Sequence, residues 1–229
     1  MRALLLAIGI ALLVAVELGS PPPDPRPTEV LDGEPAADPC AQSTLTKPED
    51  LLLLEAPDRP VWQKPDQIMD ELLIAERSAV ADIGAGSGWF TIRLAQRVGP
   101  QGTVYAQDVQ EEMLNAITRR VNRLGLKNIQ TRLGENNSTN LPANALDAIL
   151  VVDVYGEVPA PVQFLLSLTE SLKPQGRIGI VNYKPGSGGP GPTCRRVSDA
   201  VVMRDANQAN LRVISTMDLR YQYLVVLGR

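Results

Sequence analysis

The sequence predicts an α/β fold in which a seven-stranded, mostly parallel sheet is covered by helices on both faces. From about residue 60 onward, short β-branched runs alternate with segments of helical periodicity, which is typical of parallel strands joined by crossover helices. The apolar run at residues 146–152 is of the kind expected for a strand buried on both faces. With 229 residues, 44% of them hydrophobic, the chain is long enough for one domain with its own core.

The expected elements follow one another at short intervals. An amphipathic helix starts at Pro65, because Ile68, Met69, Leu72 and Leu73 recur at spacings of three and four. Parallel strands are expected at residues 79–83, 103–107, 129–133, 146–152 and 177–182. Helices are expected at residues 88–98, 111–124 and 163–172. Two last strands, near residues 211–215 and 221–227, close the sheet.

The first 58 residues are expected to precede this domain, which then occupies residues 59–229. Residues 1–20 contain Arg2 and an apolar run, as in a signal peptide, and the run is shorter than the roughly 20 residues of a spanning helix. Because Glu17 and Leu18 fit a signal peptidase site poorly, an uncleaved membrane anchor through residues 3–18 is the alternative. We therefore expect a domain that is exported (periplasmic or secreted) or membrane-anchored. Residues 21–58 are predicted to be a Pro-rich disordered linker.

Composition excludes several kinds of function. The net charge of −4 argues against a nucleic-acid partner, because phosphate neutralisation needs clustered Lys and Arg. The sequence has no histidine, so proton transfer must use Asp, Glu, Tyr, Lys or water. Cys40 and Cys194 have no metal-ligand spacing, so no metal site is expected; they either pair in an oxidising compartment or remain separate thiols.

The most informative segment, residues 82–88, reads Asp-Ile-Gly-Ala-Gly-Ser-Gly and joins a strand to a helix. Alternate glycines allow a ligand close to the backbone, and the helix N-terminus offers free N–H donors. A dinucleotide fingerprint would need its third glycine at Trp89, which disfavours a NAD(P)-dependent reductase. The D-x-G-x-G-x-G pattern resembles instead the first motif of the Rossmann-like (class I) S-adenosylmethionine-dependent methyltransferases.

Four further segments extend this resemblance over roughly residues 59–229. Asp108 ends the second strand, where the family has an acidic residue that binds the ribose hydroxyls. Residues 134–137 look like the family's adenine-contacting loop, and residues 146–155 resemble its fourth motif. Residues 172–177 resemble the turn before the fifth strand, although Gln175 replaces a glycine there. The resemblance implies a Rossmann-like doubly wound fold.

The resemblance also implies a cofactor, S-adenosylmethionine, and a set of site residues. Asp82 is expected to meet the methionyl ammonium through water, and Asp108 to hold the ribose. The full expected cofactor set is Asp82, Gly84, Ala85, Gly86, Gly88, Asp108, Val109, Glu135, Asn136 and Asp153. Since a displacement at a methyl group needs alignment more than a dedicated base, Asp153 and Tyr155 are expected to orient or deprotonate the acceptor nucleophile.

Several alternatives stay open at this stage. Asp108 could cap the following helix, the residues around Asp153 could form only a strand-end turn, and Trp62 could cover the cofactor or anchor the first helix. The expected function is methyl transfer to an unidentified small-molecule or protein acceptor. The alternative is an exported, non-catalytic module that binds S-adenosylmethionine or a nucleoside. The oligomeric state is not predicted.

Overall fold

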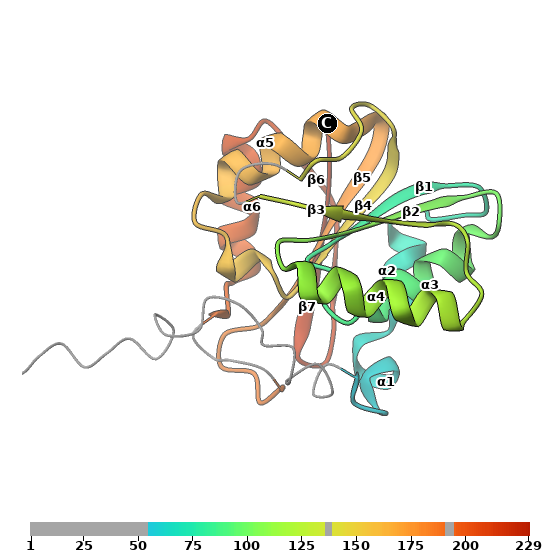
Figure 1. Ribbon diagram of the computed structural model, residues 1–229. Coiled ribbons are helices and arrows are strands. Elements are labelled where there is room, and N and C mark those ends of the chain that lie inside the picture. Colours follow the sequence, from blue (N-terminus) through green and yellow to red (C-terminus); the bar gives the residue numbers. More distant parts are fainter. Residues whose placement is uncertain (1–54, 136–138, 191–194) are drawn as a thin grey trace, which may run out of the picture. The chain divides into compact units, whose positions relative to one another are not determined.

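The structure, a computed structural model, describes residues 55–135, 139–190 and 195–229. Its centre is one seven-stranded sheet with the strand order β3-β2-β1-β4-β5-β7-β6 (Figure 1). The strands are β1 (Ala79–Ile83), β2 (Thr103–Asp108), β3 (Ile129–Leu133), β4 (Leu146–Val152), β5 (Leu172–Tyr183), β6 (Arg212–Asp218) and β7 (Gln222–Gly228). Strands β1 to β5 pair in parallel, and β7 is antiparallel to both β5 and β6. The predicted fold class is confirmed.

Helices cover both faces of the sheet. On one face lie α2 (Pro65–Glu71), α3 (Trp89–Val98) and α4 (Glu111–Arg123); on the other lie α5 (Pro161–Ser171) and α6 (Asp199–Gln208) (Figure 1). A short α1 (Arg59–Gln63) precedes α2, and a 3-10 turn, η2 (Tyr155–Glu157), follows β4. Helix α4 has acidic residues in its first turn and arginines in its last, which complements the helix dipole.

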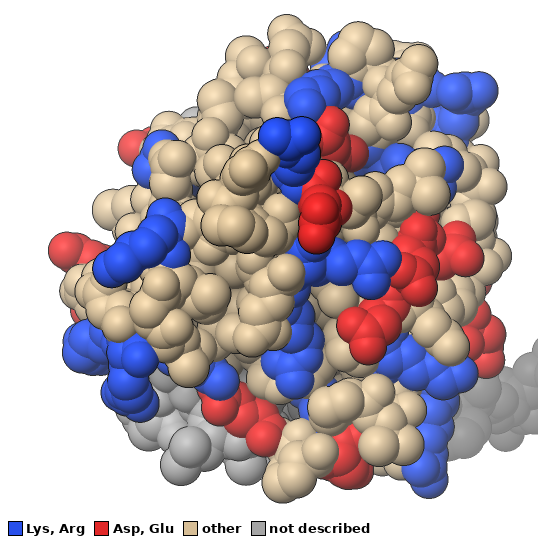
Figure 2. Space-filling view, turned by 90° about the vertical axis from the view of Figure 1, so that its right-hand side faces the viewer, with Lys and Arg blue, Asp and Glu red and all other residues tan. Residues whose placement is uncertain are grey.

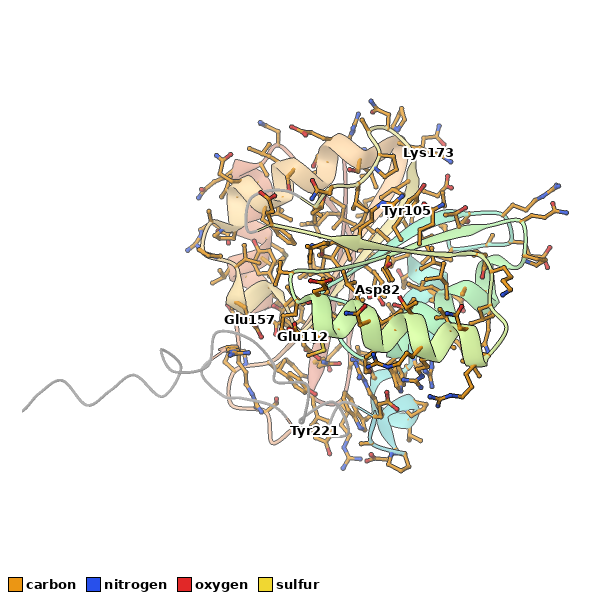
Figure 3. The ribbon with its side chains drawn as sticks, viewed as in Figure 1. Asp82, Tyr105, Glu112, Glu157, Lys173 and Tyr221 are labelled. Atoms are coloured by element: carbon orange, nitrogen blue, oxygen red, sulfur yellow. The ribbon has the colours of Figure 1, made fainter. Side chains whose placement is uncertain are left out.

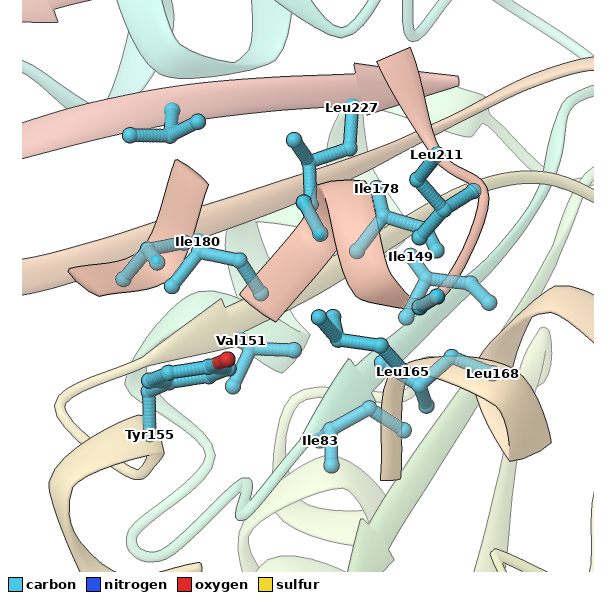
Figure 4. Close-up of a cluster of buried hydrophobic side chains, with 14 of the residues drawn as sticks. Ile83, Ile149, Val151, Tyr155, Leu165, Leu168, Ile178, Ile180, Leu211 and Leu227 are labelled. Atoms are coloured by element: carbon cyan, nitrogen blue, oxygen red, sulfur yellow. The ribbon is translucent and has the colours of Figure 1, made fainter. Parts of the chain in front are cut away.

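The core is divided by the sheet into two layers, because successive side chains of a strand point to opposite faces. Ile149 and Val151 of β4 pack with Leu165 and Leu168 of α5 (Figure 4). Leu150, between them in the sequence, packs on the opposite face with residues of α2 and α3. A strand such as β4, buried on both faces, holds the site-bearing residues that follow it in a fixed position.

Most expected elements agree with the structure within a few residues, and four details differ. Leu73 is exposed rather than buried, because it follows α2 with φ +54°. Strand β5 begins at Leu172, so the expected turn at residues 174–176 lies within it. Helix α6 was not predicted; its apolar stripe is short, with Val202 and Ala206 buried beside the polar Asp205. At the end of the expected disordered linker, Glu55 forms an ion pair with Arg120.

The expected leader at residues 1–20, nearly all of the expected linker and both cysteines lie outside the described residues. In the part of the chain that is described, no helix is both long and apolar enough to cross a membrane.

Candidate cofactor site

A cavity of about 200 Å³ opens at the carboxyl ends of β1, β2 and β4. Parallel strands bring these ends to one edge of the sheet, where ligands of open α/β sheets bind. In Figure 3, Asp82 and Glu157, which both line the cavity, lie toward the lower end of the sheet, and Lys173 lies toward the upper end. The structure thus collects at one edge residues that are far apart in the sequence.

Eight of the expected site residues line this cavity. They are Asp82, Gly84, Ala85, Gly86, Asp108, Val109, Glu135 and Asp153. Gly88 and Tyr155 do not line it, and Asn136 lies outside the described residues.

The glycine loop between β1 and α3 curves closely around the strand ends. Gly84 and Gly86 have φ of +65° and +52°, which side chains rarely adopt. A Cβ on Gly84 would lie 2.2 Å from Cγ2 of Val154, so the loop passes tightly against the residues after β4. Gly88 serves the turn itself: it is the N-cap of α3 with φ +77°, and a Cβ there would lie 3.1 Å from Ile117.

Asp108 ties this loop to the end of β2. Its Oδ2 accepts the backbone N–H of Gly86 over 2.9 Å, and its Oδ1 accepts that of Gln110 over 3.0 Å. Burial raises the pKa of the Asp108 carboxyl, and the backbone donors partly offset this. Asp108 is not the N-cap of α4, which is Gln110, so its bond to the Gln110 amide stabilises the turn just before the helix. A carboxylate has about four lone-pair positions, so Asp108 keeps acceptor capacity for a ligand in the cavity that it lines.

Asp82 is a second buried carboxylate, at the end of β1. Its Oδ2 accepts the Thr91 hydroxyl of α3 over 2.6 Å. Burial raises the pKa of Asp82 to about 6, against the lowering effects of Thr91 and the Arg59 charge. A carboxylate in this position favours a cation in the cavity, because a nearby positive charge restores its ionised form.

Asp153 follows β4 and is held in an unusual backbone conformation, with φ +60°. Its backbone N–H donates to Val181 over 2.9 Å, and its two carboxylate oxygens lie 2.7 and 2.9 Å from Nε2 of Gln222 in β7. Burial raises the pKa of Asp153 to about 7, while the Arg59 charge and Gln222 lower it. The carboxyl group therefore gains and loses its proton near neutral pH.

Tyr155 lies away from the cavity, and its position does not support the catalytic role expected for it. Its ring is buried among aliphatic side chains on the α5 and α6 face of the sheet (Figure 4). Its hydroxyl donates to Oδ2 of the buried Asp205 over 3.0 Å, and burial raises the pKa of the phenol. Because η2 starts at this residue, the chain turns its side chain into the core instead of over the strand ends.

Arg59 of α1 lines the cavity and was not anticipated from the sequence. Its guanidinium carbon lies 4.2 Å from the centre of the Trp89 ring system, where a cation is attracted to the aromatic face. Burial lowers the pKa of the guanidinium, and the charges of Asp153 and Asp82 raise it. A positive group thus stands near two carboxylates at one end of the cavity. No local motif marks Arg59, because α1 reaches the site only through the fold.

Trp62, also in α1, acts as an anchor. It is buried against Tyr183 and Tyr221, with ring centroids 6.2 and 5.7 Å apart, and it does not line the cavity. Of the two alternatives for this residue, the structure supports the core role.

The opposite wall of the cavity comes from the segment after β4. Glu157, Val158 and Pro159 line it together with Phe164 of α5. Glu157 forms an ion pair with Arg195, and burial raises the pKa of the carboxyl against the effect of this arginine. Apart from this pair, the wall is mainly apolar. Glu157 was not anticipated either, because its position depends on η2.

The described residues contain no group of three or more acidic, His or Cys side chains arranged to hold a metal ion. On the face shown in Figure 2, acidic and basic side chains are intermixed, and no continuous basic surface forms there.

Comparison with known proteins agrees with this geometry. A sequence profile described as a methyltransferase domain matches residues 74–212. The crystal structure of an S-adenosylmethionine-dependent methyltransferase from Aquifex aeolicus superposes with a TM-score of 0.76 at 31% identity, covering 80% of this chain and 98% of that one.

Two curated relatives resemble the chain over shorter stretches. A nocamycin O-methyltransferase from Saccharothrix syringae is 32% identical over 107 residues, which are 45% of this chain and 37% of that protein. A protein-L-isoaspartate O-methyltransferase from Pyrococcus horikoshii is 34% identical over 101 residues, 44% of this chain and 42% of that protein. The matches thus span less than half the length of these relatives. Through the profile match and the Aquifex structure, the chain belongs to the methyltransferase domain family, with the class I fold.

Proposed function

We propose that the cavity binds S-adenosylmethionine and that the domain transfers its methyl group to an acceptor lying against Asp153. The observation that carries the proposal is the Asp108 carboxylate, which is bonded to the glycine loop and lines the same cavity as Asp82. The two hydroxyls of a ribose can donate hydrogen bonds to an acceptor at this position. An ionised carboxylate accepts them in charge-assisted bonds, which are stronger than those to a neutral acceptor.

The residues present fit the nucleoside half of this cofactor. The glycine loop brings its backbone to the cavity, since Gly84, Ala85 and Gly86 all line it. Val109 and Met113 offer apolar surface beyond Asp108, and Glu135 offers a carboxylate at the cavity wall. Apolar contact combined with an acceptor suits a purine base bearing an amino group.

The residues also fit an amino-acid tail. Such a tail carries an ammonium and a carboxylate, and this end of the cavity has an anion, Asp82, and a cation, Arg59. We infer that Asp82 meets the ammonium, directly or through water, and that Arg59 meets the carboxylate. Asp82 is held in place by the short bond that it accepts from Thr91.

In the reaction, the protein aligns the reactants and accepts a proton. When bound, the cofactor supplies an electrophilic methyl group on a sulfonium. The chain's residues orient the acceptor, exclude water and provide Asp153, whose pKa of about 7 suits the acceptance of a proton at neutral pH. We therefore propose an acceptor that loses a proton on methylation, such as a hydroxyl, a thiol or a protonated amine.

Calorimetry of the full chain with S-adenosylmethionine and S-adenosylhomocysteine tests the binding. Asp108→Asn should weaken binding roughly 10- to 100-fold, because it replaces charge-assisted hydrogen bonds worth about 1.5–3 kcal/mol. Asp147→Asn is the matched control, since Asp147, near the start of β4, accepts hydrogen bonds from Lys173 and from the Ala79 amide of β1 and does not line the cavity. Absence of binding by the folded wild-type protein would refute the proposal.

A second measurement separates the enzyme from a silent binding module. The relatives named above methylate nocamycin and protein isoaspartate according to their names, so candidate acceptors should include both small-molecule and protein extracts. Formation of S-adenosylhomocysteine in any extract supports catalysis. Tight binding without turnover in all of them would instead support the non-catalytic module.

We also propose that residues 1–20 direct the domain to or across a membrane, as a signal peptide or as an anchor. The support is the composition of the segment, with Arg2 before an apolar run. A reporter enzyme fused after Arg229, active on only one side of the membrane, tests this. Equal cytoplasmic activity with residues 1–20 deleted or retained, together with recovery of both fusions in the soluble fraction, would contradict it.

A further inference from the structure

Asp153 stands at the end of a chain of buried hydrogen bonds that starts in α1. Nε of Arg59 donates to Oε1 of Gln63 over 2.6 Å, and Nε2 of Gln63 donates to Oε1 of Gln222 over 2.9 Å. Nε2 of Gln222 then contacts both Asp153 oxygens, at 2.7 and 2.9 Å. Gln63 and Gln222 have no exposed surface. The chain thus links α1, β7 and the end of β4.

The direction of this chain is fixed by chemistry. A guanidinium can only donate hydrogen bonds, so the amide oxygen of Gln63 must face Arg59. The amide nitrogen of Gln63 therefore faces Gln222, whose oxygen accepts it. This leaves the nitrogen of Gln222 to face Asp153. Arg59, at the far end of the hydrogen-bond chain from Asp153, consequently holds both amides in one of their two possible orientations.

This order decides where Asp153 can carry a proton. Because Gln222 presents a donor to both oxygens, the O–H of the protonated acid has no acceptor on that side. Asp153 is also one of the residues that line the cavity, so a group in the cavity can accept its proton. The carboxyl group thus exchanges its proton with whatever occupies the cavity and not with the interior.

We propose that Gln63 and Gln222 are positioning residues that orient the Asp153 carboxylate and keep its proton-bearing side toward the cavity. The proposal rests on the proposed function only in taking Asp153 as the group that meets the acceptor. Arg59, Gln63 and Gln222 all lie outside residues 74–212, the segment that the family profile matches. Of the four residues in the hydrogen-bond chain, Asp153 alone lies within the profile match.

The other ionisable groups around Asp153 are the same in every variant considered below. They are Arg59 of α1, Glu157 of η2, Tyr183 of β5, Arg196 after β5 and Tyr223 of β7. Gln63→Glu adds one buried charge to this set, so Gln222→Met, which adds none, separates the effect of the hydrogen-bond chain from that of the charge.

The test is a pH titration of Asp153 by carbon-13 NMR, in the full chain labelled at aspartate carboxyl carbons, with Asp153→Asn assigning the signal. Gln63→Glu is nearly isosteric and removes the donor from this position. Its carboxylate would hold Arg59 and accept from Gln222, so Gln222 must turn its oxygen toward Asp153. We expect the pKa of Asp153 to rise by about one unit or more, because a donor to the ionised form becomes an acceptor from the protonated form.

Two further variants make the result decisive. Gln67→Glu adds the same charge at an exposed position of α2, outside the chain, and should leave the pKa of Asp153 unchanged. Gln222→Met removes the donor directly, should raise the pKa, and decides the matter if Gln63→Glu does not fold. An unchanged pKa in the folded Gln63→Glu protein, or an equal shift in Gln67→Glu, would overturn the proposal.

Calorimetry with S-adenosylhomocysteine on the same samples keeps the two proposals apart. A protein that binds this nucleoside but shows no shift of Asp153 retains the proposed function and loses this inference. A protein that shows the shift but binds no nucleoside retains the positioning chain and loses the proposed function.

Discussion

The contact between Gly84 and Val154 allows a quantitative test of how the cofactor loop is held. In Gly84→Ala, a side chain at φ +65° costs about 1–2 kcal/mol, and a Cβ placed 2.2 Å from Val154 adds about 1–3 kcal/mol of overpacking. We expect the free energy of unfolding to fall by about 2–5 kcal/mol. Val154→Ala alone should cost about 0.8 kcal/mol, because two carbons are lost from a side chain that is only half-buried.

The double variant separates the two costs. Removing Cγ2 of Val154 should recover the overpacking cost and leave the backbone cost, giving a favourable coupling of about 1–3 kcal/mol in urea unfolding of the four proteins. Gly125→Ala is the control for the backbone alone, since Gly125 has φ +69° and no atom within 4 Å of an added Cβ. If the two substitutions are additive within about 0.5 kcal/mol, the close approach of the loop to Val154 is refuted.

Three further results are expected. Cofactor affinity, measured by calorimetry, should fall about tenfold per pH unit below about 6 as Asp82 is protonated, and Asp82→Asn should abolish that slope. Tyr155→Phe should lower the free energy of unfolding by about 1 kcal/mol, because the hydrogen bond to Asp205 is lost, and should leave cofactor affinity unchanged. A large loss of affinity would show that Tyr155 contributes to the site after all. Because the pKa of Asp153 is raised in the folded protein, this group lowers the free energy of unfolding as the pH rises from about 4 to about 7. Asp153→Asn should therefore raise the free energy of unfolding by roughly 2 kcal/mol at pH 8 and give no such gain at pH 4.

The sequence predicted the elements whose signal is local. The alternation of strands and helices placed β1, β3 and β4 at the residues where the structure has them, because each is a short run with β-branched residues that is followed by glycine or a polar residue. Helix α6 escaped notice because only part of one short stripe is buried. Leu73 was misplaced because the helical spacing continued past α2, whereas the backbone had already turned to a positive φ.

The same distinction applies to the site. Most of the cofactor half comes from one stretch, residues 82–109, which runs from the end of β1 through the glycine loop and α3 to the end of β2. Its residues could therefore be found from spacing. Arg59 and Glu157 had no such spacing, since α1 and η2 reach the cavity only through tertiary packing. Tyr155 is the opposite case. Because it lies only two residues after Asp153, the sequence suggested that both side chains face the site, but the turn η2 directs the Tyr155 ring into the core beneath α5 and α6.

This difference in origin bears on how the acceptor can be found. The family profile covers the glycine loop, Asp108 and Asp153 but ends before β7 and begins after α1. The Aquifex structure covers 80% of this chain and therefore extends beyond the profile match. An acceptor proposed from a relative thus depends on the groups that orient Asp153 as well as on the glycine loop. Substitutions at Gln63 and Gln222, which leave the glycine loop intact, should therefore change turnover with a given acceptor more than they change cofactor affinity.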